Sequence, residues 1–367
     1  MLKRNIAGPN KNPQEAAAVR DPLNGELLVN KSDIKKTTLK YCINNLKNNI
    51  PDEDVRYKVI KRKYDQVNKM KDTSEEGFEV TYDEFESVLE KFKMKSTKTY
   101  DFFIKSGDKY KMAIFTLCKR IIENEDIPDC FRTTTLYMIW KRKGPMDILK
   151  NNRFLHMKEV LARTVDSIVV RQMKQPLISN LSIYQVGGLP GHSIHEHLLT
   201  IKTVLARLEE TGGGLIFLLM DIISFFDKED IYDCLDTLEA LNINKKAIRM
   251  WYLLNKDTRI KVKTAFGLTK EALVGDCLGQ GTAGAGLVSA ANLDLGLQKS
   301  FNTSKNIMSY GQVRVQPLSY QDDVGTICAD VAMARDQAQR LTKMLKEKTL
   351  DAHPEKSGIL VLGSKLR

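Results

Sequence analysis

The chain has 367 residues, of which 42% are hydrophobic, and such a chain is expected to fold into one large domain with an extension, or into two domains. Lysine and arginine outnumber aspartate and glutamate by 57 to 46, and the formal net charge of +11 favours a polyanionic partner such as nucleic acid. The sequence holds no run of about eighteen apolar residues, which excludes a membrane-spanning helix and argues against a membrane partner.

The cysteine pattern and the N-terminal residues indicate the compartment. The six cysteines lie far apart, without the CxxC spacing of a zinc knuckle, and they do not suggest a disulfide framework. The first thirty residues hold no apolar segment of the kind found in a secretory signal. We therefore expect a soluble intracellular protein with reduced thiols, in the nucleus or the cytoplasm.

Residues 1–77 are predicted to form a basic N-terminal extension. Residues 1 to about 30 are polar and rich in Pro, Asn and Gly, as in a linker. A second, basic helix is expected over 54–71, and it would either follow a nucleic-acid backbone or form an ordinary solvated amphipathic helix. Between them a helix is expected from Ser32, with one apolar face made of Ile34, Leu39, Cys42, Ile43 and Leu46.

Helices and a basic hairpin are predicted over residues 78–177. The segment 78–93 suggests a short strand followed by a helix, and an amphipathic helix is expected to end before Pro128. The β-forming run 131–140 leads into Lys141, Arg142, Lys143 and Gly144, as a strand leads into a basic hairpin tip that could hold phosphates. The stretch 151–177 is predicted to be one long helix with Arg153 at its start.

A central strand is predicted over residues 215–220. This continuous apolar run, LIFLLM, follows three glycines and is typical of a strand buried on both faces. Asp221 comes directly after it, either as a helix cap or as a functional carboxylate. Helices are expected over 227–242 and, after a glycine-rich turn, over about 285–298.

Two adjacent carboxylates, Asp322 and Asp323, interrupt a segment that reads as two strands of a hairpin. Like charges side by side repel, so the pair is either a solvated turn or a site for a cation. If the hairpin lies beside the central strand, Asp221 and Asp322 converge, and converging carboxylates suit hard divalent cations. Pro317 removes a backbone donor and predicts an edge strand or a bulge before the turn. A further helix is expected over 331–348.

Taken in order along the chain, these motifs resemble those of the reverse transcriptase family, most closely the non-LTR (LINE-like) retrotransposon enzymes. The resemblance rests on a strand ending in Asp221, with Phe-Asp five and six residues later, then Gln-Gly-Thr, Tyr-x-Asp-Asp and Lys-Ser. The segment QVGGLPGHSIHEHLL also resembles the family's Gln-x-Gly stretch. The resemblance covers roughly residues 78–363.

The resemblance implies an α+β fold. The expected architecture is a polymerase palm with an antiparallel sheet in a split βαβ (ferredoxin-like) arrangement, together with fingers made of helices and the basic hairpin. The reverse transcriptase domain is expected over 78–366, with fingers at about 78–211 and the palm at about 212–366. Neither a thumb nor an endonuclease domain is expected within the chain.

The family's metal site maps onto the three aspartates. By resemblance, Asp221 and Asp322 coordinate two Mg²⁺ ions, with Mn²⁺ as a possible substitute, and Asp323 supports the site. Lys356 resembles the lysine that protonates the departing pyrophosphate, although an ordinary surface lysine is the alternative.

The resemblance also implies substrate contacts. Phe226 would be the gate under the incoming sugar that favours deoxynucleotides, or else an ordinary core aromatic. Gln280 and Gly281 match the turn that lines the nucleotide and template. Lys143 and Arg153 resemble the fingers cations that neutralise the triphosphate, with Lys141 and Arg142 as alternatives to Lys143, and a solvated tip as the alternative to any such role.

Three histidines form the pattern HxxHxH at His192, His195 and His197. We disfavour a zinc site because no cysteine or acidic ligand partner is evident nearby. Ser193 is the better candidate here for contact with a substrate strand.

The sequence therefore predicts an RNA-directed DNA polymerase of a retroelement. Its partners would be an RNA template, a DNA primer and deoxynucleoside triphosphates, and other retroelement domains are possible partners. The alternative is a non-catalytic nucleic-acid-binding remnant or a domesticated protein with the same fold, which would bind RNA without the aspartates. An RNA-synthesising relative or an intron maturase is disfavoured by Phe226, because RNA synthesis needs room for the 2′-hydroxyl.

Overall fold

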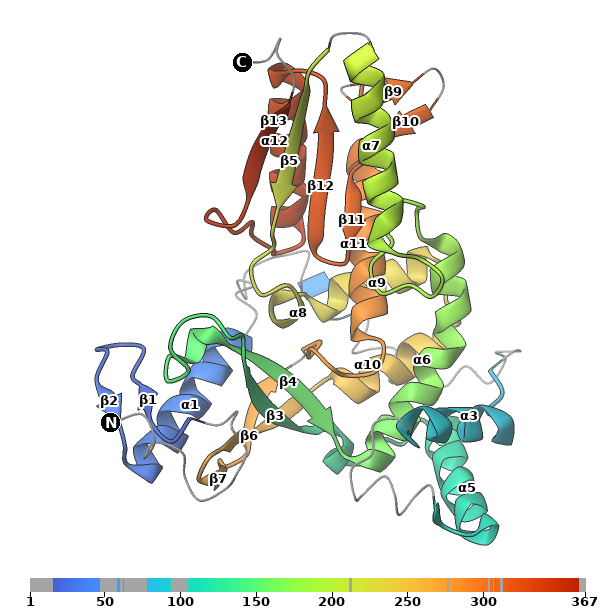
Figure 1. The fold of residues 1–367 in the computed structure, drawn as a ribbon. Coiled ribbons are helices and arrows are strands. Elements are labelled where there is room, and N and C mark those ends of the chain that lie inside the picture. Colours follow the sequence, from blue (N-terminus) through green and yellow to red (C-terminus); the bar gives the residue numbers. More distant parts are fainter. Residues whose placement is uncertain are drawn as a thin grey trace. The chain divides into compact units, whose positions relative to one another are not determined.

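The computed structural model describes residues 16–46, 58–59, 62, 78–93, 105–210, 213–275, 277–302, 304–305, 307–310 and 313–362. The basic helix predicted over 54–71 lies almost wholly outside this described part. The chain divides into two compact units, each built from separate stretches of sequence (Figure 1). Unit 1 takes the described residues within 1–48, 62–173 and 244–285, and unit 2 takes those within 49–61, 174–243 and 286–367.

Unit 1 combines helices with a five-stranded sheet in the order β4-β3-β6-β7, with β8 also paired to β6. The β3–β4 pair is antiparallel, whereas β3 and β6 run parallel. Its elements are β1 (Val19–Arg20), β2 (Leu27–Leu28), α1 (Lys31–Leu46), α3 (Tyr82–Lys93), α5 (Asp108–Asn124), η1 (Asp129–Arg132), β3 (Thr133–Trp140), η2 (Leu149–Asn151), β4 (Asn152–Lys158), most of α6 (Val160–Asn180), α10 (Lys245–Asn255), β6 (Thr258–Thr264), β7 (Gly267–Leu268) and β8 (Ala272–Gly275).

Helix α1 covers one face of this sheet. Cys42 and Leu46 are fully buried and pack against Leu136 of β3 and Ile260 of β6. The helix predicted from Ser32 is thus confirmed, and its apolar face is the one that is buried.

The single helix predicted over 151–177 is wrong at its start. Residues 152–158 form strand β4, which pairs along its whole length with β3, and helix α6 begins only at Val160. Burial alternates along β4, with Phe154, His156 and Lys158 directed inward and Arg153 exposed. Arg153 therefore lies on a strand, because β4 is the second strand of the hairpin that β3 begins.

The short strand predicted at the start of 78–93 is also wrong. Residues 78–81 form no strand, and Thr81 instead caps helix α3. The amide N–H of Glu84 donates to the Thr81 hydroxyl, and the Glu84 carboxylate accepts from the amide of Thr81, both at 3.3 Å. This reciprocal capping box satisfies backbone donors that a strand would have paired in a sheet.

Unit 2 is built around a four-stranded antiparallel sheet in the order β11-β12-β5-β13. The antiparallel sheet expected from the sequence is therefore present. Its elements are α7 (Ile194–Glu210), β5 (Leu215–Met220), α8 (Phe225–Lys228), α9 (Ile231–Ala240), α11 (Ala285–Phe301), β9 (Met308–Tyr310), β10 (Val313–Val315), β11 (Leu318–Tyr320), β12 (Asp323–Cys328), α12 (Val331–Glu347) and β13 (Gly358–Leu362).

Strands β12 and β13 flank β5 on its two sides, and each runs antiparallel to it. They are therefore parallel to one another, and helix α12 connects them along the chain. A βαβ unit with another strand inserted between its two strands is a split βαβ unit. Strand β11 lies at the edge of the sheet, as Pro317 predicted.

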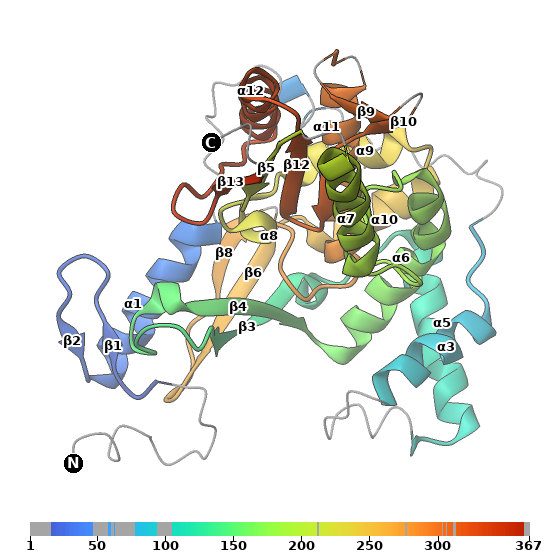
Figure 2. The same ribbon diagram turned by 45° about the horizontal axis from the view of Figure 1, so that its top comes forward.

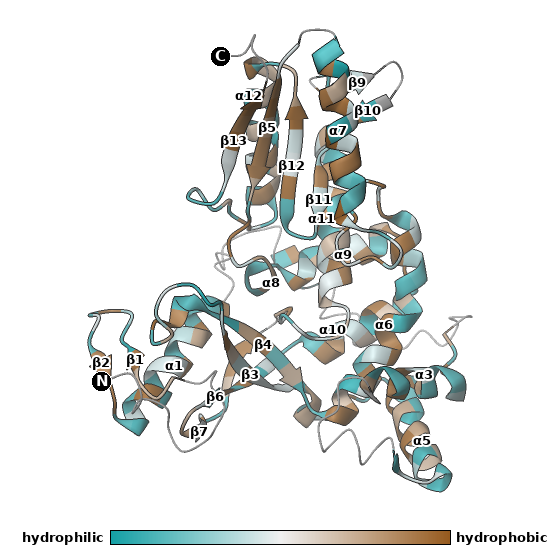
Figure 3. Ribbon diagram, in the orientation of Figure 1, coloured by the Kyte–Doolittle hydropathy of each residue, from teal (hydrophilic) through white to brown (hydrophobic). Residues whose placement is uncertain are grey.

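The two faces of the unit 2 sheet are covered by different helices. Helix α12 packs on one face, where Ile216, Cys328 and Ala334 meet, and helix α7 packs on the other through Val204 against Leu215 and neighbouring residues (Figure 2). The apolar residues of β5 lie between the two helices, and this strand is labelled and coloured brown in Figure 3. Burial on both faces is confirmed for its first half only, because Leu219 near the end is 47% exposed.

The helices and the cysteines bear on the membrane and disulfide predictions. Within the described residues, no helix is both long enough and apolar enough to cross a bilayer. None of the six cysteines, all of which belong to the described part of the chain, forms a disulfide.

Candidate active site

The register of the unit 2 sheet brings the aspartates together. Met220, the last residue of β5, pairs with Val324 of β12, so Asp221 and Asp323 are the residues that adjoin this pair on the two strands. Tyr320 pairs with Asp323, so Gln321 and Asp322 form the two-residue loop of the hairpin. The predicted neighbourhood of the hairpin and the central strand is confirmed.

The aspartates of the hairpin carry raised pKa values. Burial is the main cause at Asp322, and the charges of Asp323 and Asp221 raise its pKa further. Burial also raises the pKa of Asp323, with Asp221 as the second cause. Both shifts are opposed by the positive charge of Lys356. The site is thus a concentration of negative charge that a cation would relieve.

Lys356 forms an ion pair with Asp221. Its Nζ lies 2.8 Å from Oδ2 of Asp221, and the two side chains are 60% and 24% exposed. The loop that carries Lys356 is tied to the end of β5, because the backbone N–H of His353 donates to the Asp221 carbonyl at 2.7 Å. The amide of Asp221 in turn donates to the Ser357 hydroxyl at 3.3 Å.

The donor set suits a divalent cation in its chemistry, because Mg²⁺ takes carboxylate oxygens. Asp221, Asp322 and Asp323 supply those oxygens and would be the residues to hold the ions. Within the described residues, however, no group of three or more His, Cys, Asp or Glu side chains already stands at metal-binding spacing. Oδ2 of Asp221 accepts from the Lys356 ammonium.

A cavity of about 430 Å³ opens beside the carboxylates, between helix α7 and one face of the sheet. Asp221, Asp323 and Lys356 provide its charged groups. The ring of Phe217 lies over Gly325, where an added Cβ would come within 2.7 Å of the ring. The remaining lining is largely apolar and comes from Ile194, His197, Leu198, Ile201, Leu219, Met220, Leu318, Tyr320 and Val324.

The three histidines on and before α7 have separate partners. His192 lies 3.0 Å from Glu196, His195 lies 3.2 Å from the Ser193 hydroxyl, and Nε2 of His197 lies 3.0 Å from the carbonyl oxygen of Tyr184. Ser193 is exposed and its amide donates to Glu196 at 2.8 Å, so it stands at the start of the helix. The contact with Glu196 corrects the expectation that no acidic residue lies near the histidines, since Glu196 stands within the HxxHxH pattern itself.

Phe226 lies in the short helix α8, five residues after Asp221. It is half-buried, packs against the core cluster that contains Ile222 and Val324, and lies 5.3 Å from the ring of Phe225. Phe226 therefore contributes to the core, which was one of the two roles expected from the sequence. Its role as the gate under the incoming sugar stays a prediction.

The other candidate residues belong to unit 1. Lys143 is exposed in the connection between β3 and β4, and Arg153 is exposed on β4. Gln280 and Gly281 form a turn ahead of α11, and the Gln280 carbonyl accepts from the backbone N–H of His156 at 2.8 Å. Gly281 has a φ of +101°, and a Cβ there would lie 2.4 Å from Leu155. The glycine is thus required by both conformation and space.

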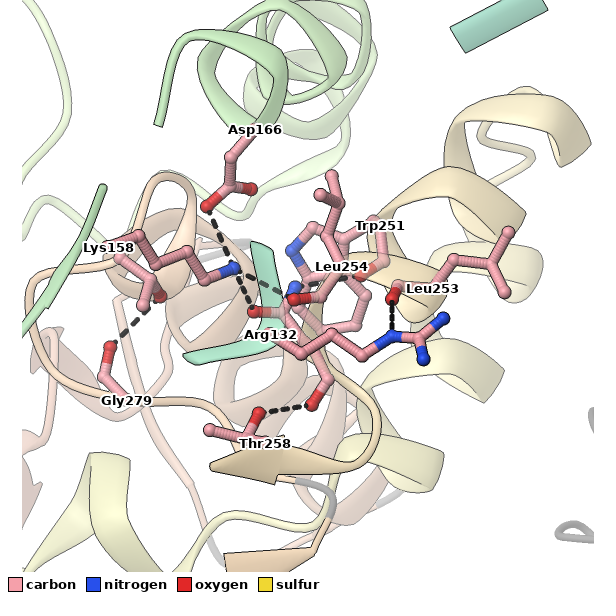
Figure 4. A network of polar contacts seen from close by, with 10 residues as sticks. Arg132, Lys158, Asp166, Trp251, Leu253, Leu254, Thr258 and Gly279 are labelled. Carbon is pink, nitrogen blue, oxygen red and sulfur yellow. Dashed lines mark hydrogen bonds and ion pairs between the residues drawn. The ribbon is translucent and has the colours of Figure 1, made fainter. Parts of the chain in front are cut away.

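A buried ion pair at the end of β4 was not anticipated from the sequence. Lys158 donates to Asp166 at 3.3 Å, to the Leu254 carbonyl at 2.9 Å and to Asn255 at 3.1 Å (Figure 4). Burial raises the pKa of Asp166, while the charge of Lys158 opposes the rise. The pair links β4 to α6 and to the end of α10.

His156 of β4 packs against the Gln280 turn. Its ring is fully buried against Gly279, where an added Cβ would come within 2.2 Å of the ring. Burial lowers the pKa of His156 to about 3, with Lys158 as the second cause, so the ring is neutral at physiological pH. A neutral imidazole in this place acts by packing.

Comparisons with known proteins give distant similarity. No protein-family model matches the chain. The transposon TX1 uncharacterized 149 kDa protein of Xenopus laevis is 23% identical over 208 residues, which are 56% of this chain and 16% of that protein. The chain therefore spans a small part of the length of this curated relative. Telomerase from Candida albicans, solved in complex with a fragment of telomeric RNA, gives a TM-score of 0.47 at 12% identity, covering 64% of this chain and 43% of that chain.

Proposed function

We propose that this chain is an RNA-directed DNA polymerase, a reverse transcriptase of a retroelement. The observation that carries the proposal is that Asp221 directly follows β5 while Asp323 begins β12, the strand paired with β5, with Asp322 in the adjoining turn. Neighbouring, partly buried carboxylates repel one another and lower the stability of the fold unless a cation binds them. The order of the three aspartates along the chain matches the family that the sequence resembles. The distant similarity to a transposon protein agrees with a retroelement origin.

The proposed reaction extends a DNA primer on an RNA template. The primer 3′-oxygen forms a bond to the α-phosphorus of a deoxynucleoside triphosphate, the bond to the bridging oxygen breaks, and pyrophosphate leaves. Asp221 and Asp322 would hold two Mg²⁺ or Mn²⁺ ions, and Asp323 would support them. Such ions, when bound, lower the pKa of the attacking hydroxyl and offset the charge on the leaving group. Lys356 would carry the proton that pyrophosphate accepts.

Substrate contacts are proposed for the residues that the family resemblance singles out. Lys143 and Arg153 would offset the triphosphate charge, because positioning and charge stabilisation are most of what a protein contributes to phosphoryl transfer. Gln280 and Gly281 would line the nucleotide and template, and Ser193 would contact a substrate strand. The net charge of +11 suits a polyanionic duplex. We also propose that the protein works with other domains of the same retroelement. It would act in the nucleus or the cytoplasm.

A primer-extension assay tests the proposed function. Purified protein with Mg²⁺, an RNA template, a labelled DNA primer and the four deoxynucleotides is expected to yield products whose sequence follows the template. Omitting the template or adding a chelator should abolish them. Salt-dependent RNA binding without any extension at high protein concentration would contradict the polymerase and favour a non-catalytic RNA-binding protein.

Phe226 provides a test of sugar selection. Phe226→Ala is expected to lower the preference for deoxynucleotides over ribonucleotides by about tenfold or more, because the ring would no longer block a 2′-hydroxyl. Phe226→Tyr keeps the ring and should keep the preference, which makes it the matched control. The ratio of kcat/KM for the two nucleotide types measures the effect. Equal ratios in the wild type and in Phe226→Ala would leave Phe226 as a core aromatic only.

A further inference from the structure

The segment that precedes helix α7 runs along the catalytic hairpin of unit 2. The backbone N–H of Ser319 donates to the Tyr184 carbonyl at 2.8 Å, and that of Val186 donates to the Ser319 carbonyl at 3.1 Å. These bonds make a parallel β-bridge between Gln185 and Ser319, beside strand β11. The segment therefore lies next to the turn that carries Asp322.

Gln185 directs its side chain at this turn. Its Oε1 accepts from the backbone N–H of Gln321 at 3.0 Å, and its Nε2 donates to the Gln321 carbonyl at 3.4 Å. The same Oε1 accepts from the N–H of Gly187 at 3.0 Å. Gln185 is only 1% exposed, so these backbone groups are held by a side chain that water barely reaches. One amide group thus satisfies both the donor and the acceptor of Gln321.

The turn needs such support because of its backbone conformation. Gln321 has a φ of +57°, in the left-handed region that disfavours residues with a Cβ. Such a conformation persists where neighbouring groups hold it. The residue is also directly followed by Asp322, so any relaxation of Gln321 would move the catalytic carboxylates.

Gly187 lies directly against the backbone of the same turn. A Cβ on Gly187 would lie 2.1 Å from the amide nitrogen of Gln321 and 2.6 Å from the carbonyl carbon of Tyr320. Only a residue without a side chain allows the two backbones to come this close. The spacing Gln-x-Gly therefore has a physical reason, because an extended segment presents its first and third residues to the same neighbour.

We propose that Gln185 is a positioning residue, which together with Gly187 fixes the Gln321 turn and through it the aspartates of the hairpin. The effect on catalysis rests on the proposed polymerase function, whereas the effect on the turn does not. Gln185 needs no contact with substrate or metal for this role. Its amide acts on the backbone that carries the carboxylates.

Amide hydrogen exchange tests the contact without any catalysis. In the wild-type protein the Gln321 N–H is expected to exchange at least about tenfold more slowly than an unprotected peptide N–H, because it is hydrogen-bonded in a buried contact. Gln185→Ala should raise the exchange rate of this N–H by about tenfold, and Gly187→Ala should raise it as well by pushing the turn away. An unprotected Gln321 N–H in the wild type would overturn the proposal, even if neither variant folds.

Thr237→Val is the matched control in the same unit. Thr237 is 3% exposed and donates to Asn292 of helix α11 at 2.9 Å, a hydrogen bond that does not involve Gln185 or the Gln321 turn. Its loss should lower the overall stability while the exchange rate at Gln321 stays within about twofold of the wild type, measured under strongly folding conditions. Equal acceleration at Gln321 in Thr237→Val and Gln185→Ala would show that Gln185 acts only through general stability.

Kinetics provide the second readout. Gln185→Ala is expected to lower kcat in primer extension by about a hundredfold with less than about a threefold change in the KM for deoxynucleotide, because misplaced carboxylates affect chemistry more than binding. Retention of the wild-type kcat would overturn the positioning role. A wild-type protein without polymerase activity would refute the proposed function instead, and hydrogen exchange would still decide whether Gln185 holds the turn.

Discussion

Replacement of Asp322 by asparagine is expected to abolish template-directed primer extension, lowering the rate by at least about a thousandfold. The variant keeps the shape of the side chain but loses the charge that would hold a divalent cation. Stabilisation of the charge that develops in the transition state is commonly worth this much to an enzyme. Single-turnover primer extension with Mg²⁺ measures the loss.

The same substitution is expected to stabilise the folded protein at neutral pH, by at most about 1 kcal/mol because solvent screens the site. Burial and the neighbouring aspartates raise the pKa of Asp322, so its ionised form is disfavoured in the folded state. An acid with a raised pKa favours folding below its ordinary pKa and loses this contribution as the pH rises through the raised value. The gain of Asp322→Asn over the wild type should therefore shrink on acidification. Chemical denaturation at neutral pH and near pH 4 measures it.

Asp330→Asn serves as the control. Asp330 caps helix α12 by accepting from the N–H of Met333 at 2.7 Å, and asparagine caps helices about as well. This variant should keep the wild-type rate of primer extension. An Asp322→Asn protein that extends primers at the wild-type rate would remove Asp322 from the chemistry.

Removal of Lys158 is expected to destabilise unit 1 strongly. Lys158→Met would leave Asp166 fully buried without its cationic partner, and breaking a buried ion pair from one side costs about 3–5 kcal/mol. The acceptors on Leu254 and Asn255 would lose a donor as well. Denaturation followed by a probe in unit 1, such as the buried Trp251, reports the loss.

Acid should rescue this variant in part. Without Lys158 the ionised form of Asp166 is penalised further, so stability is lost as the pH rises through its raised pKa and regained as the pH falls. Lys261→Met is the matched control, because it breaks an exposed 3.1 Å pair with Glu271 and should cost less than about 1 kcal/mol. A Lys158→Met protein as stable as Lys261→Met would contradict the assigned weight of the buried pair.

The carboxylate site could be predicted from sequence because local patterns carry most of it. The apolar run 215–220 marks a central strand, and a doublet at 322–323 inside a β-forming stretch marks a hairpin turn. Only their adjacency had to be assumed, and the register of β5 with β12 confirms it. The roles assigned to Asp221, Asp322 and Asp323 stay predictions until an assay tests them.

Strand β4 could not be predicted in the same way. Its inward positions include His156 and Lys158, which a hydropathy pattern reads as exposed. Lys158 is buried because groups far along the chain, such as Asn255, accept its hydrogen bonds, and the His156 ring is buried because Gly279 leaves room for it. The contact of Gln185 with Gln321 was missed for a similar reason, since it joins residues 136 positions apart. The signal available was the Gln-x-Gly spacing itself, whose purpose becomes visible only beside the turn.

The parallel pairing of β3 with β6 has a consequence for synthesis on the ribosome. Strands β3 and β4 emerge early as a hairpin, but the neighbour that covers the other side of β3 is made only when Thr258–Thr264 has been translated. Until then the nascent chain presents an open strand edge, the kind of surface through which unfinished proteins associate. Messages cut short between the codons for Lys158 and Thr258 are therefore expected to yield aggregating products, so a shortened expression clone should retain β6.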